Sequence, residues 1–370
     1  MNYEVANKLN YRLLFNSLIS LLIIIGVVLT TQITMSNPKQ FCIEPEPDAS
    51  WTFGRNIAIN DKYLAISDSL RSKVIVYTPD DSGQWQKTRE ILPPADLDLS
   101  HANSWFANDG IELDGDVLTI SARTKNPKWF EASQSQRYEI PYFLYWRYLT
   151  NLETGTPLKQ IDSLVEPERE LDRVRFNLLR QGKIEQFILP NMGKKALGSN
   201  GVYRRVALDE NLLLVGYLSE DDTGGAYLFD LASPEVEPIE LSVEDTALGR
   251  TIAVSQQFAA VGFDEINWQW AYGLYARSFM TLIRNLENGA TSTIESFGTV
   301  SLSGNILAIM HPYDYEAPTK FLELYRLDEN AHAHLIDKRT VLKGEVQNGF
   351  LFTQKIDDSY RVCIEPLPKN

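Results

Sequence analysis

The residue types best suited to metal binding or acid–base chemistry are sparse in this sequence. It holds four histidines, His101, His311, His332 and His334. His332 and His334 alternate, so a strand would place both rings on one face, but the spacing puts no carboxylate or third ligand beside them. We therefore predict no metal site and no catalytic residue, which favours a protein that is not an enzyme.

Aromatic side chains in two long connections are better candidates for function. One connection, Arg123 to Pro141, contains Trp129 and Phe130, and a second contains Trp268 and Trp270. Aromatic rings in exposed loops offer a large contact area to a ligand. We predict that these four residues bind a ligand, and the alternative that the rings fold back over the sheets as core stays open.

The charge balance is acidic. The chain has 35 Lys and Arg residues against 49 Asp and Glu residues, a formal net charge of -14. Since it has no basic run and no nucleic-acid motif, we exclude nucleic acid as a partner. Several carboxylates fall on the equivalent loop of different repeated units, and these are Asp221, Asp222, Asp264, Asp314 and Glu316. They predict an electronegative face that would suit a cationic or carbohydrate ligand.

Two cysteines occur, Cys42 and Cys363, and each stands in the same local phrase, Cys-Ile-Glu-Pro. In an oxidising compartment a bond between them would close a very long loop, and the chain-entropy model then gives a stabilisation of several kcal/mol. Two buried strand cysteines that never meet are the alternative. Both interpretations stay open at the level of sequence.

The N-terminal segment has the features of a membrane element. Residues 13–31 are mostly apolar, close to the roughly 20 residues that cross a bilayer as a helix, and Lys8 and Arg12 precede them. The positive-inside rule keeps residues 1–12 cytoplasmic and exports everything that follows. We predict a signal anchor or signal peptide over residues 13–35. The protein is then a single-pass membrane protein, or a secreted one if the segment is cleaved.

Short strands repeated about every fifty residues make up the exported region. A phrase that begins at Phe53-Gly54 consists of a strand, a polar turn and a second strand, and it returns near Leu248 and Phe297. The hydrophobic period is two, aromatic residues mark a third strand, and a fourth strand follows another polar turn. Four short strands in each repeated unit predict an all-β fold, a β-propeller.

The number of blades depends on one irregular step. Second strands are expected at Leu64, Leu118, Leu213, Ala259, Leu307 and Tyr360, and the step from Leu118 to Leu213 is double the others. A degenerate unit with a hairpin over residues 174–189 gives seven blades, which we prefer, whereas an insertion gives six. The last unit is short of strands, so we predict a linker and ring-closing strand in residues 36–50, ahead of the propeller over residues 51–370.

The unit with Phe-Gly, an Ile-Ala-Ile strand, an Asn-Asp turn and a Leu-Ala-Ile-Ser strand resembles the FG-GAP repeats of bacterial exported proteins. Those repeats are similar to the propeller repeats of integrin α subunits. The resemblance implies a propeller and, in many members, adhesion or ligand binding, without conferring an activity. Calcium-binding FG-GAP repeats carry an Asp-x-Asp-x-Asp-Gly loop, and Glu220, Asp221 and Asp222 lack that spacing. We assign no cofactor, and calcium binding stays open as an alternative.

These features together predict an extracytoplasmic β-propeller that acts as a binding or scaffolding module at the cell envelope. An envelope protein or a carbohydrate is the expected ligand, and the N-terminal helix is the expected membrane contact. The alternative is a propeller-fold hydrolase or lyase with its site at the central channel, where the first strands of the blades converge.

Overall fold

The computed structural model describes residues 40–368, apart from 102–103, 134–142, 165–173, 181–182, 190–205, 219–223, 234, 243–247, 264–279, 297, 312–319 and 355–359. The chain divides into two compact units, Met1–Phe41 and Cys42–Asn370. Within the described ranges no helix is long and apolar enough to cross a membrane. The predicted signal anchor, residues 13–35, lies outside the described residues.

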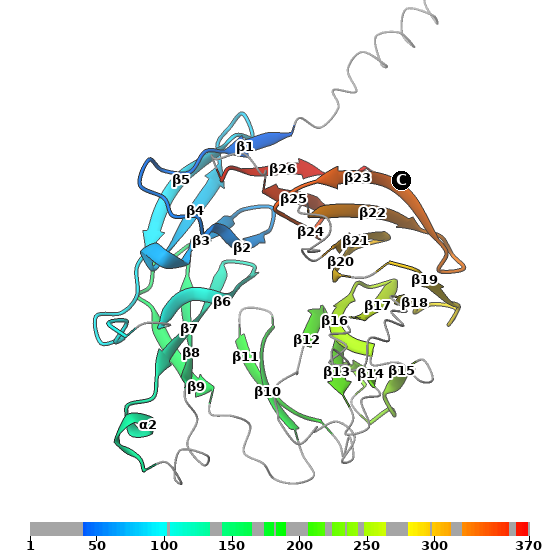
Figure 1. Ribbon diagram of the computed structural model, residues 1–370, viewed down its shortest axis with the longest axis horizontal. Coiled ribbons are helices and arrows are strands. Elements are labelled where there is room, and N and C mark those ends of the chain that lie inside the picture. Colours follow the sequence, from blue (N-terminus) through cyan, green and yellow to red (C-terminus); the bar gives the residue numbers. More distant parts are fainter. Residues whose placement is uncertain are drawn as a thin grey trace, which may run out of the picture. The chain divides into compact units, whose positions relative to one another are not determined.

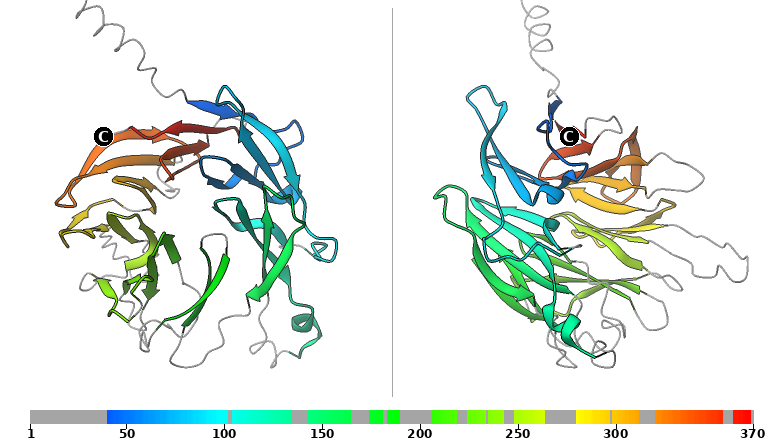
Figure 2. Two further views of the ribbon diagram at one scale, coloured as in Figure 1. Left: turned by 180° about the vertical axis from the view of Figure 1, so that it is seen from behind. Right: turned by 60° about the vertical axis from the view of Figure 1, so that its left-hand side comes forward.

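The fold is an all-β propeller with four-stranded blades, as predicted, and the strands of each blade lie side by side (Figures 1 and 2). Blade 1 contains β2 (Phe53–Ile59), β3 (Leu64–Asp68), β4 (Lys73–Pro79) and β5 (Trp85–Ile91). Blade 2 contains β6 (Trp105–Asp114), β7 (Val117–Lys125), β8 (Phe143–Asn151) and β9 (Lys159–Leu164). Blade 3 contains β12 (Val206–Asp209), β13 (Leu212–Leu218), β14 (Gly224–Asp230) and β15 (Ile239–Ser242).

The other three blades follow the same plan. Blade 4 contains β16 (Leu248–Val254), β17 (Phe258–Phe263), β18 (Thr281–Asn285) and β19 (Thr291–Ile294). Blade 5 contains β20 (Thr299–Ser303), β21 (Ile306–Met310), β22 (Phe321–Leu327) and β23 (Ala333–Thr340). Blade 6 contains β24 (Lys343–Gln347), β25 (Phe350–Gln354), β26 (Val362–Pro366) and β1 (Phe41–Ile43). Two short helical turns, η1 (Ser69–Arg71) and α2 (Pro127–Glu131), join the second and third strands of blades 1 and 2.

The preferred number of seven blades is wrong, because the described residues form six four-stranded sheets and one isolated hairpin. That hairpin joins β10 (Val174–Arg180) to β11 (Lys183–Leu189), so the strands expected over residues 174–189 are present. The alignment of the last unit is also wrong. Its second strand is β25 rather than the segment around Tyr360, since β24 precedes it in the sheet. The sequence Lys343–Gln347 alternates polar and apolar residues, and this weak pattern concealed a first strand.

The cores lie between neighbouring blades. Every side chain of β3 and of β21 is buried, because a second strand is covered on both faces by adjacent sheets, whereas the fourth strands β5 and β23 are mostly exposed. One apolar cluster joins blades 1 and 2, and others join blades 3 and 4, blades 4 and 5, and blades 5 and 6. The continuous apolar second strands of the repeat are explained by this double coverage.

The polar turn of the repeat links one blade to the next. Asn60 Nδ2 in blade 1 donates to the carbonyl of Gly115 in blade 2 at 2.7 Å, and Ser255 Oγ in blade 4 donates to the carbonyl of Gly304 in blade 5 at 2.8 Å. Asn348 Nδ2 in blade 6 donates to the carbonyl of Ile59 in blade 1 at 2.6 Å. The short polar turns therefore hold adjacent sheets in register as well as reversing the chain.

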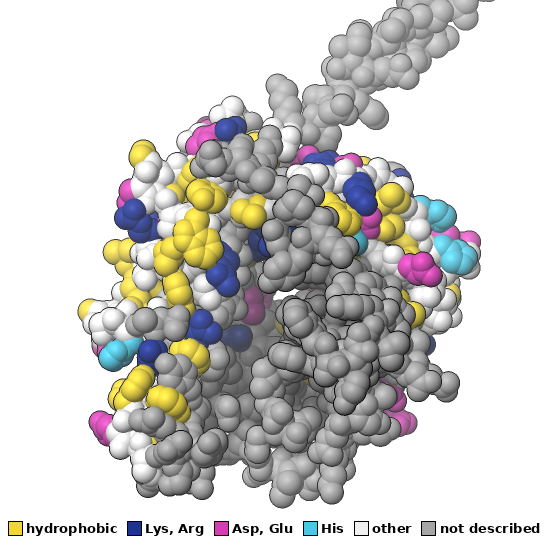
Figure 3. Space-filling view, in the orientation of Figure 1, with side chains coloured by type: hydrophobic (Ala, Val, Ile, Leu, Met, Phe, Trp, Pro, Cys, Tyr) yellow, Lys and Arg dark blue, Asp and Glu magenta, His cyan; other side chains and the backbone are white. Residues whose placement is uncertain are grey.

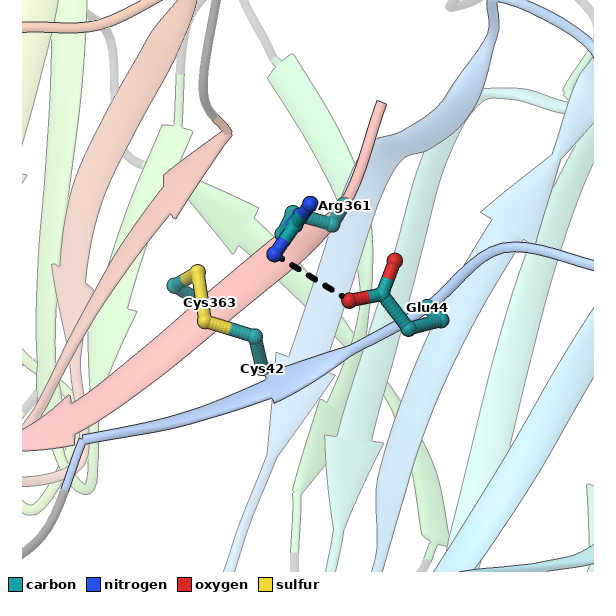
Figure 4. The surroundings of a disulfide bond; sticks show 4 residues. All are labelled: Cys42, Glu44, Arg361 and Cys363. Atoms are coloured by element: carbon teal, nitrogen blue, oxygen red, sulfur yellow. Dashed lines mark ion pairs between the residues drawn. A yellow bond between two sulfur atoms is a disulfide. The ribbon is translucent and has the colours of Figure 1, made fainter. Parts of the chain in front are cut away.

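A disulfide bond between Cys42 and Cys363 fastens β1 to β26 across a sequence separation of 321 residues (Figure 4). Beside it, Arg361 pairs with Glu44 at 3.2 Å. Blade 6 also contacts blade 1 directly, because Gln354 Nε2 donates to the carbonyl of Phe53 at 2.7 Å. The disulfide bond therefore ties the N-terminal strand into the last blade, and the hydrogen bond from Gln354 joins that blade to the first one.

The segment from Glu44 to Thr52 connects blade 6 to blade 1, and its even-numbered side chains make the contacts. Glu46 pairs with Lys73 at 2.5 Å and with Lys87, and Asp48 pairs with Arg71 at 3.1 Å. The hydrogen bond from Lys73, followed by the one from Lys87, lowers the pKa of Glu46. The chain turns twice here, where the Ala49 N–H donates to the carbonyl of Glu46 at 2.8 Å and the Phe53 N–H donates to that of Ser50 at 3.0 Å, so side-chain contacts rather than strand pairing fasten this segment to blade 1.

Candidate functional site

The helical turn α2 carries two of the sequence-predicted ligand-binding residues, Trp129 and Phe130. The sequence forms a turn here because Asn126 caps it, accepting a hydrogen bond from the Lys128 N–H at 3.1 Å, and Pro127 occupies the first helical position. The turn ends where the Ala132 N–H donates to the carbonyl of Lys128 at 3.1 Å. Neither aromatic residue is buried in the blade, so α2 presents both of them at the protein surface.

Phe130 is the centre of a group that we term the α2 cluster, consisting of His101, Lys125, Trp129 and Phe130. The phenyl ring is 44% exposed and meets Trp129 edge to face, with ring centroids 5.3 Å apart. His101 stacks with it at 6.1 Å, and Lys125 Nζ lies 5.4 Å from the ring centroid. Edge-to-face and cation–π contacts each favour a fixed ring geometry, so the cluster holds Phe130 in one position toward solvent.

Blades 1 and 2 also carry other exposed apolar and basic side chains. In Figure 3, hydrophobic side chains and Lys and Arg side chains gather on the left of the face, over blades 1 and 2. Trp51, 59% exposed, and Leu70, 41% exposed, belong to this part of the fold, and the Leu70 N–H donates to Thr52 Oγ1 beside Trp51 at 3.0 Å. Arg123 Cζ lies 4.7 Å from the centre of the Phe143 ring in blade 2. Large exposed rings combined with cations are typical of a contact surface.

The remaining sequence-predicted site residues lie outside the described residues. They are Trp268 and Trp270, the weak calcium candidates Glu220, Asp221 and Asp222, and the loop carboxylates Asp264, Asp314 and Glu316. The electronegative face predicted from these carboxylates stays a prediction for the same reason. Of the four aromatic candidates, the structure brings together Trp129 and Phe130, and the alternative that they form blade core does not apply to the exposed ring of Phe130.

Blade 5 contains a buried polar cluster that sequence reasoning missed. The Glu323 side chain accepts hydrogen bonds from Ser296 Oγ and Tyr325 OH, both at 2.8 Å, and from Lys338 Nζ at 3.0 Å. Its Oε2 atom lies 2.8 Å from His311 Nε2, and the His311 ring stacks on Phe321 with centroids 3.9 Å apart. The only sequence signal was a charged residue inside the apolar phrase Phe321 to Tyr325.

The residue types of this cluster suggest a nucleophilic triad, but its geometry does not provide one. In a working triad the histidine uses one ring nitrogen for the nucleophile and the other for the carboxylate. Here Ser296 Oγ, at 3.1 Å, and Glu323 both face His311 Nε2, and the serine hydroxyl donates to the carboxylate. Burial lowers the pKa of His311. The arrangement satisfies a buried carboxylate and secures the connections around it to blade 5.

The Glu323 cluster predicts a pH dependence of stability. Burial alone would raise the pKa of Glu323, but hydrogen bonds from Tyr325, Lys338, His311 and Ser296 outweigh it and hold that pKa at about 2, below the ordinary 4.5. A carboxylate with a lowered pKa stabilises the fold above pH 4.5 and loses this contribution as the pH falls toward 2. We expect Glu323→Gln to lower the free energy of unfolding at pH 7, and this deficit to shrink below pH 4.5.

Chemical denaturation of the wild type and the Glu323→Gln variant at pH 7, 5 and 3 measures that difference. Glu345→Gln, which changes a half-buried carboxylate of β24, is the matched control and should leave the pH profile close to that of the wild type. A deficit that is the same at pH 7 and pH 3 would contradict a charged Glu323 in the folded state.

Comparison with known proteins supplies no family. No protein-family model and no curated protein matches the sequence. Among solved structures, a streptogramin B lyase is 11% identical with a TM-score of 0.44, and the match covers 90% of this chain and 98% of that one. The α-L-arabinanase of Penicillium chrysogenum complexed with arabinobiose is 9% identical with a TM-score of 0.42, covering 89% and 98%. The AfRom2 CNH domain is 10% identical with a TM-score of 0.41, covering 90% and 100%. Similarity this low transfers no activity, and the FG-GAP resemblance stays a prediction.

Proposed function

We propose that this six-bladed β-propeller is a binding module and that the α2 cluster is part of its ligand-contact surface. The observation that carries the proposal is Phe130, which the cluster holds in place while 44% of it remains exposed. A rigid aromatic side chain contributes contact area at a low cost in conformational entropy, which is why such residues dominate binding sites. The positions of all four histidines outside the first strands of the blades add no support for chemistry at a central channel.

The expected ligand is an envelope carbohydrate or an envelope protein. Stacked aromatic rings with neighbouring cations suit both, because each offers apolar faces flanked by polar or anionic groups. The α2 turn belongs to a connection between strands rather than to a blade, and such connections carry function on propellers and other rigid scaffolds. The module is therefore proposed to bind through this connection, with the blades as its support.

We also propose that the propeller works outside the cytoplasm, held at the membrane by residues 13–35 or released if that segment is cleaved. The Cys42–Cys363 bond supports this location, because disulfides form and persist in oxidising compartments. Labelling of intact cells with a membrane-impermeant reagent would test it. Protection of the propeller in intact cells and labelling only after lysis would contradict an exported propeller.

A double substitution tests the binding surface. We expect Trp129→Ala/Phe130→Ala to weaken binding of the full-length protein to purified envelope polysaccharide, or to isolated envelopes, by at least tenfold, because central aromatic contacts carry most of the binding energy. Cosedimentation over a range of ligand concentrations measures the change. Leu335→Ala, which removes an exposed apolar side chain from β23 of blade 5, serves as the control for a general loss of surface apolarity. Equal binding by the wild type and the double variant would exclude the α2 cluster as the site.

A further inference from the structure

The turn between β22 and β23 in blade 5 brings two histidines to one carboxylate. His334 Nε2 lies 3.1 Å from Asp328 Oδ2, and His332 Nδ1 lies 3.4 Å from the same oxygen. The two imidazole side chains are 64% and 65% exposed and the carboxylate is 34% exposed. Figure 3 shows His side chains beside Asp or Glu side chains at the right-hand edge of the face, over blade 5. Two imidazole nitrogens and a carboxylate oxygen are a common ligand set for divalent transition metals.

The spacing of these atoms matches the edges of a metal-centred tetrahedron. With metal–nitrogen bonds of about 2.0 to 2.1 Å and metal–oxygen bonds of about 2.0 to 2.2 Å, tetrahedral geometry separates neighbouring ligand atoms by about 3.3 Å. The two nitrogen–oxygen distances, 3.1 and 3.4 Å, lie on either side of that value. No group of described His, Cys, Asp and Glu residues forms a ready-made metal site. A metal would therefore complete this one by small movements of exposed side chains, with water in the remaining positions.

Blade 1 contains the same turn without the histidines. Asp80 Oδ1 accepts from the N–H groups of Ser82 and Gln84, both at 2.9 Å, and Oδ2 accepts from Gln86 Nε2 at 3.1 Å. In blade 5, Asp328 Oδ1 accepts from the N–H groups of Asn330 and His332, both at 2.9 Å, and Oδ2 faces the side chain of His334. These partners are two, four and six residues after the aspartate, as in blade 1.

Gln84 and Gln86 thus stand where blade 5 has His332 and His334. Because glutamines maintain the turn in blade 1, the turn itself does not require imidazole rings. Formation of the turn therefore does not explain why histidines occupy these two positions.

We propose that Asp328, His332 and His334 form a binding site for a divalent transition metal of the zinc class. Neutral imidazole suits zinc, nickel and copper better than calcium or magnesium, which prefer all-oxygen sites. Asp328 Oδ1 is held by the N–H groups of Asn330 and His332, both at 2.9 Å, which leaves Oδ2 facing the two imidazole rings. The turn therefore positions this carboxylate before a metal binds.

Calorimetric titration of the untagged full-length protein with zinc chloride, after treatment with EDTA, tests the proposal. We expect one equivalent of zinc to bind the wild type, and the affinity of His332→Gln/His334→Gln, which copies the turn of blade 1, to fall at least tenfold. Asp328→Asn keeps an oxygen that can cap the turn, as Asn285 does in blade 4, but removes the charge, so it should also weaken binding at least tenfold.

Two controls separate this site from other effects. Asp80→Asn alters the carboxylate of the matching turn in blade 1, which has no histidine, and should leave zinc affinity unchanged. Thermal unfolding in EDTA should give the same Tm for the wild type and the double histidine variant, because both imidazole side chains are exposed. Absence of zinc binding to the wild type, or equal affinity in the wild type and in the double histidine variant, would overturn the proposal.

Discussion

Replacing Cys42 and Cys363 with serine is expected to lower the free energy of unfolding by about 5 to 6 kcal/mol. The disulfide bond spans 321 residues, and in the chain-entropy model a cross-link over so long a loop removes a large share of the freedom of the unfolded chain. The folded state should keep its closure, because Gln354 and Asn348 of blade 6 still donate to carbonyls of blade 1. The change therefore appears in stability rather than in the fold.

Chemical denaturation of the oxidised wild type, the reduced wild type and the double serine variant measures this effect. The reduced wild type and the variant should agree, since both lack the same constraint. Glu44→Gln, which removes only the ion pair to Arg361 beside the disulfide, is the matched control and should cost less than about 1 kcal/mol. Equal unfolding free energies for the oxidised and reduced protein would show that the bond adds nothing to the noncovalent closure.

Replacing Gly298 with alanine is expected to destabilise the protein by about 3 to 5 kcal/mol. The glycine enters β20 with a φ of +151°, and a Cβ atom there would lie 2.1 Å from the carbonyl oxygen of Met310 in the adjacent strand. The backbone of β21 cannot yield as a flexible side chain would, so steric overlap adds to an unfavourable backbone conformation. The Gly298 carbonyl also accepts a hydrogen bond from Thr251 Oγ1 at 2.8 Å, which displacement would weaken.

Gly304→Ala is the matched control for that prediction. Gly304 lies in the turn between β20 and β21 with a φ of +57°, but a Cβ atom there would meet no heavy atom within 4 Å. It should cost only about 1 kcal/mol, the penalty for a side chain in the left-handed region. Unfolding curves for the two variants separate steric overlap from backbone preference, and equal losses at the two positions would refute the steric argument.

Much of the fold could be predicted from short-range pattern. The Phe-Gly phrase, the polar turns and the aromatic third strands predicted four-stranded units, and β4, β14 and β22 lie where the aromatic runs stand. Alternation and turn chemistry are local properties, so sequence reasoning detects them well. It failed at β24, whose three polar residues are half-buried and whose identity as a first strand depends on pairing with β25.

The candidate sites were less predictable, because the contacts within them depend on how strands pair and how turns orient side chains. Glu323 meets Ser296 and His311 only through the pairing of strands in blade 5 and the connection that precedes it. Asp328 is near His332 and His334 in the sequence, yet the turn decides which of its two oxygens faces the imidazole rings. The likeness to the turn at Asp80 became visible only when the hydrogen bonds of both turns were compared. Trp129 and Phe130 were found because two aromatic residues in a long connection are conspicuous.

The sequence by itself determined an all-β chain built from repeated four-stranded units, because a period of two and short polar turns act within a few residues. The short last unit also predicted a ring-closing strand in residues 36–50, where β1 lies. Only the tertiary structure decided that there are six four-stranded blades and that Cys42 is bonded to Cys363. Strand pairing, closure and the convergence of side chains depend on contacts between segments up to hundreds of residues apart. No local pattern specifies such contacts, since their free energy arises only when the sheets have packed.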